Sequence, residues 1–230
     1  MTERLRIGEV EIDVTFKEIK NLHLSVHPPH GHVTIASPNF YDLEKVKVYA
    51  ATKLGWIKKE QRKFLEQKRE EPRMYLNQES HYFLGTRFLL KVIDASKNKV
   101  QVEGKYLVIY SKNSNDKASL EKQLYSFYRK ELRKRLMVMI EQYSNQMNIE
   151  IPSFKIRYMK TKWGSCATNN QRVWFNIELA KKPLECIEYI VVHELTHLLE
   201  RNHNKRFILL LDQFMPSWRL QKKLLNELPL

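Results

Sequence analysis

The chain has 230 residues, enough for one large domain or for a small domain packed beside a catalytic one. Its 43% hydrophobic and 29% charged residues are typical of a globular protein. No apolar run predicts a membrane span or a signal segment, and two cysteines are too few for a disulfide framework. We therefore expect a cytoplasmic protein. The formal net charge of +14 would attract nucleic acid or another polyanion, although much of it lies in helical stretches whose solvated faces account for it.

The first forty residues have the periodicity of β-strands. Val10, Ile12 and Val14 alternate with polar residues, which is typical of a strand with one buried face. Two prolines and a glycine in residues 28–31 predict a turn, and residues 32–36 predict a further strand.

Residues 42–112 continue with a helix and then more strands. Apolar residues at steps of three and four predict one helix over residues 42–70, which Asp42 would cap. Residues 74–110 return to strand patterns, with turns expected at Gly85, residues 96–98 and Gly104.

The C-terminal half is mainly helical. An apolar stripe predicts a long helix over residues 115–147, and further helices are expected from Pro183 through His197 and over residues 204–228. Short strands are expected at residues 154–159 and 173–177. No internal sequence repeat is apparent. The sequence therefore predicts an α+β protein: a β-rich N-terminal region with one helix (residues 1–112), followed by a helical half with a small sheet (residues 113–230).

The strongest chemical signal is a His-Glu-x-x-His motif inside an apolar helix. His193 and His197 are four residues apart, so both imidazoles lie on one face of the helix and can reach one zinc ion. Glu194 stands beside the first histidine, where a carboxylate can take a proton from water as a general base. The motif predicts a catalytic metal site that still needs a third protein ligand.

His203 is the favoured third ligand. It is six residues beyond His197, so the helix must end first, and Asn202 could end it by adopting a left-handed conformation. Asn204 could then cap the next helix, with Phe207 anchored in the core. Glu200 and Asp212 remain alternative third ligands.

Residues 163–166, Trp-Gly-Ser-Cys, are expected to form a loop near the metal. Ser165 could donate a hydrogen bond to the oxyanion formed during attack, or the loop could be purely structural. Cys166 could be a metal ligand in a resting state or a buried thiol. Residues 173–177 could be either an edge strand that pairs with an extended peptide or an ordinary core strand.

Four stretches of the C-terminal half support a family resemblance: residues 160–166 (KTKWGSC), 176–179 (NIEL), 189–198 (YIVVHELTHL) and 202–207 (NHNKRF). Together they resemble the YgjP-like metal-dependent hydrolases, within the zincin group that includes the SprT-like proteases. The resemblance implies a zincin-like catalytic half, with His193, His197 and His203 as ligands of one zinc ion and Glu194 as general base. Glu200 stands where the metzincins have a turn glycine, so the path from His197 to His203 must differ from theirs.

The predicted function is therefore a zinc metallopeptidase, a hydrolase that acts on a peptide or protein substrate and does not span a membrane. The alternative is a basic, nucleic-acid-associated binding module whose zinc is structural. A structural site would need four protein ligands, with Cys166 or Asp212 as the fourth.

Overall fold

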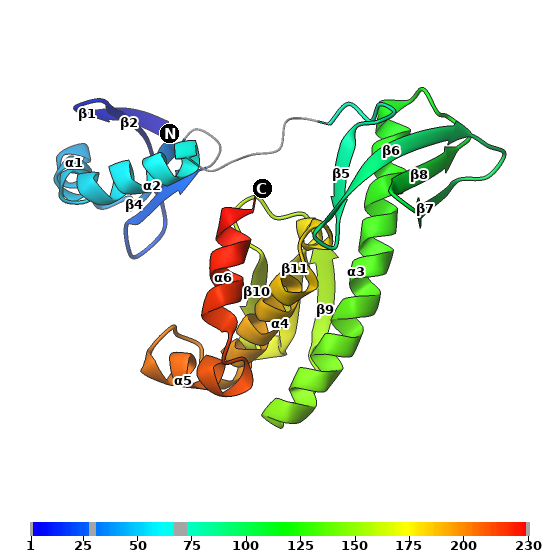
Figure 1. The fold of residues 1–230 in the computed structure, drawn as a ribbon. Coiled ribbons are helices and arrows are strands. Elements are labelled where there is room, and N and C mark those ends of the chain that lie inside the picture. Colours follow the sequence, from blue (N-terminus) through cyan, green and yellow to red (C-terminus); the bar gives the residue numbers. More distant parts are fainter. Residues whose placement is uncertain (1, 28–30, 67–72, 229–230) are drawn as a thin grey trace. The chain divides into compact units, whose positions relative to one another are not determined.

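The structure, a computed structural model, describes residues 2–27, 31–66 and 73–228, without the side chains of residues 63, 64 and 66. The chain forms two compact units, Met1–Lys68 and Arg69–Leu230, and both are mixtures of helices and strands (Figure 1). Residues 28–30 of the predicted turn and the predicted helix end at residue 70 lie outside the described residues. The boundary predicted at residue 112 does not coincide with this division, because residue 112 lies inside the second unit.

The first unit contains a four-stranded sheet. Its strands are β1 (Thr2–Ile7), β2 (Val10–Lys17), β3 (His23–His27) and β4 (His32–Pro38), in the order β1-β2-β4-β3. Strands β2 and β4 are parallel, and the two outer pairs are antiparallel. The alternation at Val10, Ile12 and Val14 is confirmed, because all three side chains are buried.

Two helices, α1 (Leu43–Thr52) and α2 (Leu54–Glu66), complete the first unit. Asp42 caps α1 as predicted, since its side chain accepts a hydrogen bond from the backbone N–H of Lys45 (2.8 Å). The prediction of one continuous helix was wrong, because the helix is interrupted at Lys53. Gly55, a poor helix former, is the second residue of α2, two positions after the interruption. Val46 and Ile57 still bury their side chains in one core with the sheet.

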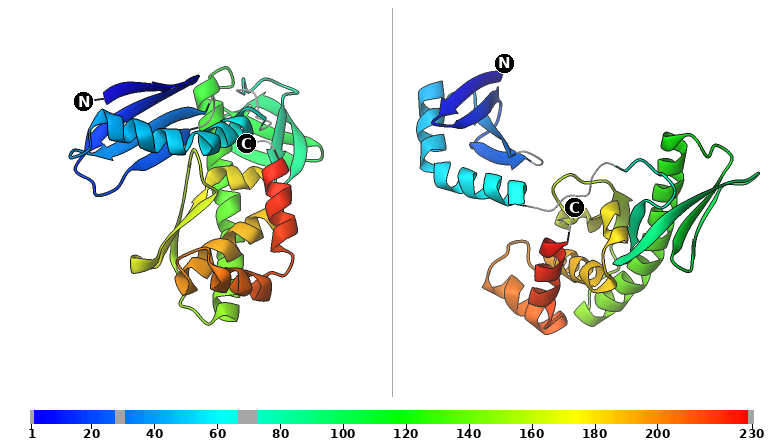
Figure 2. Two further views of the ribbon diagram at one scale, coloured as in Figure 1. Left: turned by 90° about the vertical axis from the view of Figure 1, so that its left-hand side faces the viewer. Right: turned by 45° about the horizontal axis from the view of Figure 1, so that its top comes forward.

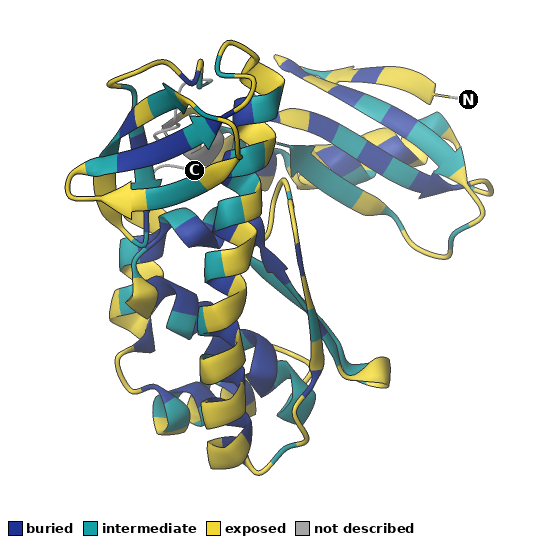
Figure 3. Cartoon of the chain, turned by 90° about the vertical axis from the view of Figure 1, so that its right-hand side faces the viewer, coloured by how far each residue is buried: buried dark blue, intermediate teal, exposed yellow. Residues whose placement is uncertain are grey.

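The second unit begins with another four-stranded sheet. Its strands are β5 (Ser80–Phe83), β6 (Thr86–Asp94), β7 (Lys99–Glu103) and β8 (Tyr106–Ser111), in the order β5-β6-β8-β7. The long helix α3 (Lys117–Met147) follows, and its buried stripe joins the sheet in one core: Leu120, Leu124, Tyr128, Leu132, Leu136 and Ile140. The opposite side of α3 is exposed (Figure 3).

The tip of the β5–β6 hairpin connects this sheet to the C-terminal helices. The backbone N–H groups of Leu84 and Gly85 donate to the carbonyls of Ala180 and Lys181 (2.8 and 3.1 Å). Gly85 has φ +79°, and a Cβ there would lie 2.8 Å from Pro183, just before the next helix. This close contact, together with the α3 core, explains why the sheet belongs to the second unit.

The two four-stranded sheets have the same topology. In each, the first two strands and the last two strands form antiparallel pairs, and the second and fourth strands pair in parallel. The sequence displays no such repeat, so the repetition is one of strand order alone.

The C-terminal part of the second unit combines a three-stranded sheet with three helices, and Figure 2 shows this part in two further views. Its elements are β9 (Ser153–Arg157), β10 (Gly164–Ala167), the 3₁₀ turns at Thr168–Asn170 and Ile177–Lys181, β11 (Arg172–Asn176), α4 (Leu184–Leu199), α5 (Lys205–Phe214) and α6 (Trp218–Glu227). The strand order β10-β11-β9 puts β11 in the centre and β10 at an edge. Residues 163–166, which were expected to form a loop, lie mostly in strand β10. Residues 173–177 lie mostly in the central strand β11, so they are not an edge strand of the sheet.

The α+β class is confirmed, with sheets in the N-terminal half and mainly helices in the C-terminal half. None of the helices in the described residues combines the length and apolar character that crossing a lipid bilayer requires.

Candidate metal centre

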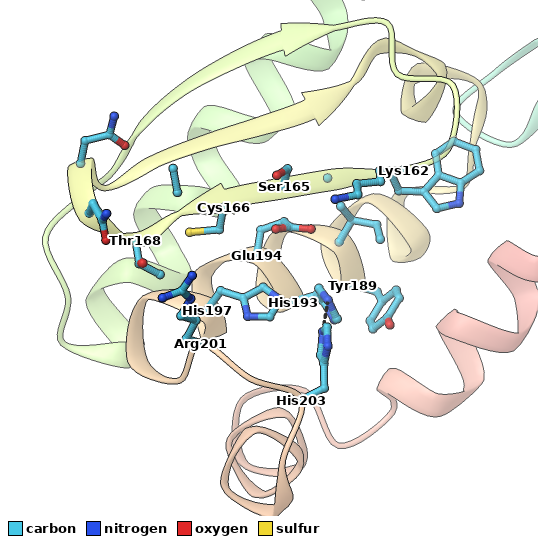
Figure 4. Close-up of a pocket in the computed structure, with 16 residues that line it drawn as sticks. Lys162, Ser165, Cys166, Thr168, Tyr189, His193, Glu194, His197, Arg201 and His203 are labelled. Carbon is cyan, nitrogen blue, oxygen red and sulfur yellow. Dashed lines mark hydrogen bonds between the residues drawn. The ribbon is translucent and has the colours of Figure 1, made fainter. Parts of the chain in front are cut away.

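Two histidines of the predicted site lie on consecutive turns of α4. The ring centres of His193 and His197 are 5.0 Å apart, as the four-residue spacing predicts. Three apolar residues close to them on α4, Val191, Val192 and Leu195, are fully buried. Core packing of this helix therefore holds both imidazoles at the wall of a cleft (Figure 4).

The chain brings His203 back to this pair after α4 ends. The helix ends at Leu199, and Glu200 is extended (φ −146°, ψ 113°). Asn202 does not adopt the left-handed conformation that the sequence predicted, so the extended Glu200 makes the break. The Nε2 atoms of His203 and His193 are then 3.1 Å apart.

One nitrogen from each of the three histidines belongs to a cluster whose atoms all lie within 4.8 Å of one another. Two nitrogens bound to one tetrahedral zinc ion at its usual bond lengths are about 3.3 Å apart, close to the separation of the two Nε2 atoms. Neutral imidazoles are also the nitrogen ligands that zinc accepts readily. The donor set and its spacing therefore fit one metal ion with an open fourth position.

The surroundings of His193 and His197 favour the neutral, metal-binding form of these two side chains. The Nδ1 of His197 faces the carbonyl oxygen of Glu200 at 3.2 Å, and since a carbonyl only accepts, this nitrogen carries the proton and leaves Nε2 free. Burial, followed by the nearby His197 and His203, lowers the pKa of His193 to about 3. Burial also lowers the pKa of His197.

Phe207 packs against all three imidazoles. Its ring centre is 5.1 Å from that of His193, 4.8 Å from His197 and 4.6 Å from His203. The predicted cap is present, because the side chain of Asn204 accepts a hydrogen bond from the backbone N–H of Phe207 (3.0 Å). The first turn of α5 thus holds the ring of Phe207 against the three histidine rings.

Glu194 is the carboxylate beside the three histidines. Its residue is 5% exposed, and burial raises its pKa to about 8, while the nearby Lys162 lowers it. A Cβ on Gly164 would lie 2.5 Å from Oε1 of Glu194 and 2.6 Å from its Cγ. Only a glycine therefore lets β10 pass this close to the carboxylate.

The other candidate ligands have different contacts. The side chain of Glu200 accepts a hydrogen bond from the backbone N–H of Asn202 (3.2 Å), and Asp212 accepts one from Nε1 of Trp218 (2.8 Å) and pairs with Arg219. Burial raises the pKa of the Cys166 thiol to about 11. Within the described part of the chain, none of these side chains belongs to the histidine cluster.

The histidines open into a cleft of about 740 Å³ whose other wall is formed by β10 and the residues around it. Gly164 faces Glu194, and side chains alternate along a strand, so Ser165 points away from the carboxylate. This orientation does not favour Ser165 as an oxyanion donor.

Among the residues that line the cleft, Lys162, Tyr189 and Arg201 were assigned no catalytic or binding role from the sequence. Tyr189 lies one helical turn before His193, with ring centres 5.7 Å apart, so the spacing that pairs the histidines could have identified it. Figure 4 shows Lys162 and Arg201 on opposite sides of the histidines. Lys162 lies in the family stretch 160–166, but the sequence assigned neither cation to the cleft, because their positions depend on where β10 and the end of α4 lie.

The similarity of the chain to known proteins is clearest at the level of the family. The family model described as "YgjP-like, metallopeptidase domain" matches residues 20–228, whereas a search of curated proteins found no match. Among solved structures, the metallopeptidase zymogen abylysin of Pyrococcus abyssi is 17% identical, with 39% of this chain and 90% of that one covered and a TM-score of 0.37. The metallopeptidase zymogen jannalysin of Methanocaldococcus jannaschii is 22% identical, with 40% of this chain and 89% of that one covered and a TM-score of 0.37.

Proposed function

The chain belongs to the YgjP-like metallopeptidase family, and we propose that it is a zinc-dependent peptidase with one zinc ion, bound by His193, His197 and His203. The observation that carries the proposal is the convergence of three imidazole nitrogens, from α4 and from the segment before α5, beside a buried carboxylate. Three neutral histidines with an open fourth position are the ligand set of a catalytic rather than a structural zinc ion.

Zinc in such a site lowers the pKa of water towards neutrality and polarises the carbonyl group of a substrate. Glu194 takes the proton from the attacking water and passes it to the leaving amine. In the metal-free protein burial raises the pKa of Glu194 above its ordinary value, and a carboxyl group whose pKa is raised towards neutrality can act first as a base and then as an acid. Because Gly164 has no side chain, it leaves room for the Glu194 carboxylate beside β10.

The free edge of β10 is the proposed binding position for an extended peptide. It lies at the end of the sheet order β10-β11-β9, and all four of its residues line the cleft. A peptide added to this edge would form main-chain hydrogen bonds next to Glu194. Lys162 and Arg201 line the same cleft, where Glu194 is the only acidic side chain among the described lining residues, so we expect a preference for acidic substrate residues.

The alternative, a binding module with a structural zinc ion, has less support. A closed structural site needs a fourth protein ligand, and within the described residues the cluster contains only the three histidines. Asp212 is engaged by Trp218 and Arg219.

Two variants test the proposal. Metal analysis of the purified protein should give about one zinc ion per chain, and His203→Ala should lose most of it, whereas Glu200→Gln should keep it. Glu194→Gln should keep the zinc and lose nearly all hydrolysis of an unstructured protein substrate such as casein. Zinc retained in His203→Ala would remove that ligand, and full activity in Glu194→Gln would remove the general base.

A further inference from the structure

The outer face of the three-stranded sheet carries a cationic and aromatic surface that the peptidase site does not use. Side chains alternate along β11, so Val173 and Phe175 are buried in the core while Arg172 and Trp174 point to the other face. On the neighbouring strand β9, Lys155 lies opposite Trp174, and Arg157 is two residues further along. We call these four residues, Lys155, Arg157, Arg172 and Trp174, the Trp174 face.

The two arginines of this face flank the indole ring. The guanidinium carbon of Arg157 is 5.2 Å from the ring centre of Trp174, and that of Arg172 is 6.0 Å away. Both distances are in the range of a cation–π contact. The guanidinium groups therefore stay beside the ring and leave their N–H donors available to a ligand.

The cations of the Trp174 face have no carboxylate partner among the described residues. In the part of the chain that the structure describes, Lys155, Arg157 and Arg172 form no ion pair. Between Glu150 and Glu178 the sequence has five Lys and Arg residues and no carboxylate. A surface of this kind attracts an anionic partner.

The charge continues from the face towards the rim of the cleft. Lys160 and Lys162 lie in the connection between β9 and β10 and are exposed. The side-chain amide of Asn176 donates to the carbonyls of Met159 and Lys162 (both 2.8 Å), which fixes this connection against β11. The cations thus continue from β9 into the connection that leads to the cleft.

We propose that the Trp174 face binds single-stranded nucleic acid. Its phosphates would lie against Lys155, Arg157 and Arg172, and a base would stack on the indole or on a guanidinium plane. Single strands offer regularly spaced phosphates together with unstacked bases, and sheet surfaces with aromatic and basic side chains bind them in this way. An acidic peptide offers the charge without the planar rings, and a duplex hides the faces of its bases.

The test is fluorescence anisotropy of the full-length protein with labelled oligo(dT) and oligo(U) of about 16 nucleotides. The triple variant Lys155→Ala/Arg157→Ala/Arg172→Ala should weaken binding roughly tenfold or more and reduce the slope of log K against log salt by about 2, the loss expected for three phosphate contacts on a single strand. The matched control, Lys99→Ala/Lys122→Ala/Lys130→Ala, removes equal charge from the groove between β7 and α3 and should change affinity much less.

A second pair of variants separates stacking from charge. Trp174→Leu should weaken binding roughly tenfold without changing the salt slope, and Trp174→Phe should restore most of the affinity, because base stacking needs an aromatic plane. Unchanged zinc content and melting temperature would show that these variants are folded. Stronger binding of oligo(dT) than of oligo(U), or the reverse, identifies the kind of strand and supports the proposal in either case.

Three results would overturn the proposal. They are equal losses in the two triple variants, tighter binding of a duplex or of poly-glutamate than of the single strands, and no measurable binding at low salt. Binding is measured without substrate cleavage, so the outcome does not depend on the proposed peptidase mechanism.

Discussion

Burial of Glu194 makes the stability of the metal-free protein depend on pH. The folded protein keeps the Glu194 proton up to about pH 8, whereas the unfolded chain releases it near the ordinary value of 4.5. Between these values the folded state binds more protons, so the free energy of unfolding falls as the pH rises through this window. The cost is present above the folded-state pKa and absent below 4.5.

Glu194→Gln should therefore stabilise the metal-free protein, by an amount that grows between pH 5 and pH 8. One pKa unit corresponds to about 1.4 kcal/mol, so the gain should reach a few kcal/mol at most. Urea unfolding of chelator-treated wild type and variant at several pH values measures it. His193, whose lowered pKa destabilises the fold as the pH falls below 6.5, is common to both proteins and cancels in the comparison. A constant difference across the window would contradict the raised pKa.

Gly164→Ala should abolish most peptidase activity while leaving zinc binding intact. The new methyl group would meet the Glu194 side chain at 2.5–2.8 Å, and it would displace the carboxylate rather than strain the backbone. Ser165→Ala is the matched control in the same strand, because its side chain points the opposite way. We expect the control to keep its hydrolysis rate; a large loss there would reinstate Ser165 as an oxyanion donor.

At the scale of elements, the turn that begins α5 positions the third histidine. Asn204→Ala should cost about 1 kcal/mol of stability through the lost cap and should also weaken zinc binding severalfold, since Phe207 and His203 flank the capped turn. Asp116→Ala is the control, because Asp116 caps α3 through the backbone N–H of Ala118 (3.0 Å). It should cost similar stability and leave zinc affinity unchanged in a competition titration. Equal effects on zinc affinity would mean that general stability, not the cap, controls the site.

The elements that sequence predicted well are those whose own pattern is strong. The helix of His193 and His197 and the long helix α3 have continuous periodicity, and both are present near their predicted bounds. Strand β10 was expected to be a loop, because a four-residue Gly-Ser-Cys-Ala segment has little intrinsic preference for a strand. Its pairing with β11 decides its structure. The same limit applies to Lys162 and Arg201, which enter the cleft through the placement of neighbouring elements.

The return of His203 illustrates a second limit. The sequence predicted correctly that the chain must turn between His197 and His203, but it assigned the turn to a left-handed Asn202. The structure uses an extended Glu200, whose carbonyl also faces the Nδ1 of His197. Several backbone paths satisfy the same spacing, and only the tertiary contacts select one of them.

At the scale of the whole molecule, the two units have separate cores. The buried residues of one cluster run from Leu5 to Ile57 and those of the other from Tyr75 to Leu225. The boundary predicted at residue 112 overlooked this, because the contacts of β5 to β8 with α3 and with the start of α4 join residues far apart in the sequence. All four residues of the proposed centre lie in the second unit.

Residues 69–230 alone should therefore fold and bind about one zinc ion per chain, as the three-histidine site requires. Circular dichroism, thermal melting and metal analysis of this fragment check the expectation. The same fragment with His203→Ala is the control and should fold without retaining zinc. Loss of cooperative melting in both fragments would show that the first unit is needed for the fold of the second.

The shared order of the two four-stranded sheets has a consequence for the kinetics of folding. Each sheet consists of two antiparallel hairpins, whose partners are close in sequence and whose formation takes microseconds. Only the parallel pairs, β2 with β4 and β6 with β8, join one hairpin to the other. Because loop closure must precede those contacts, we expect the docking of the two hairpins to limit the rate of folding in both sheets. On this expectation the chain meets the same kinetic barrier twice, once in each unit.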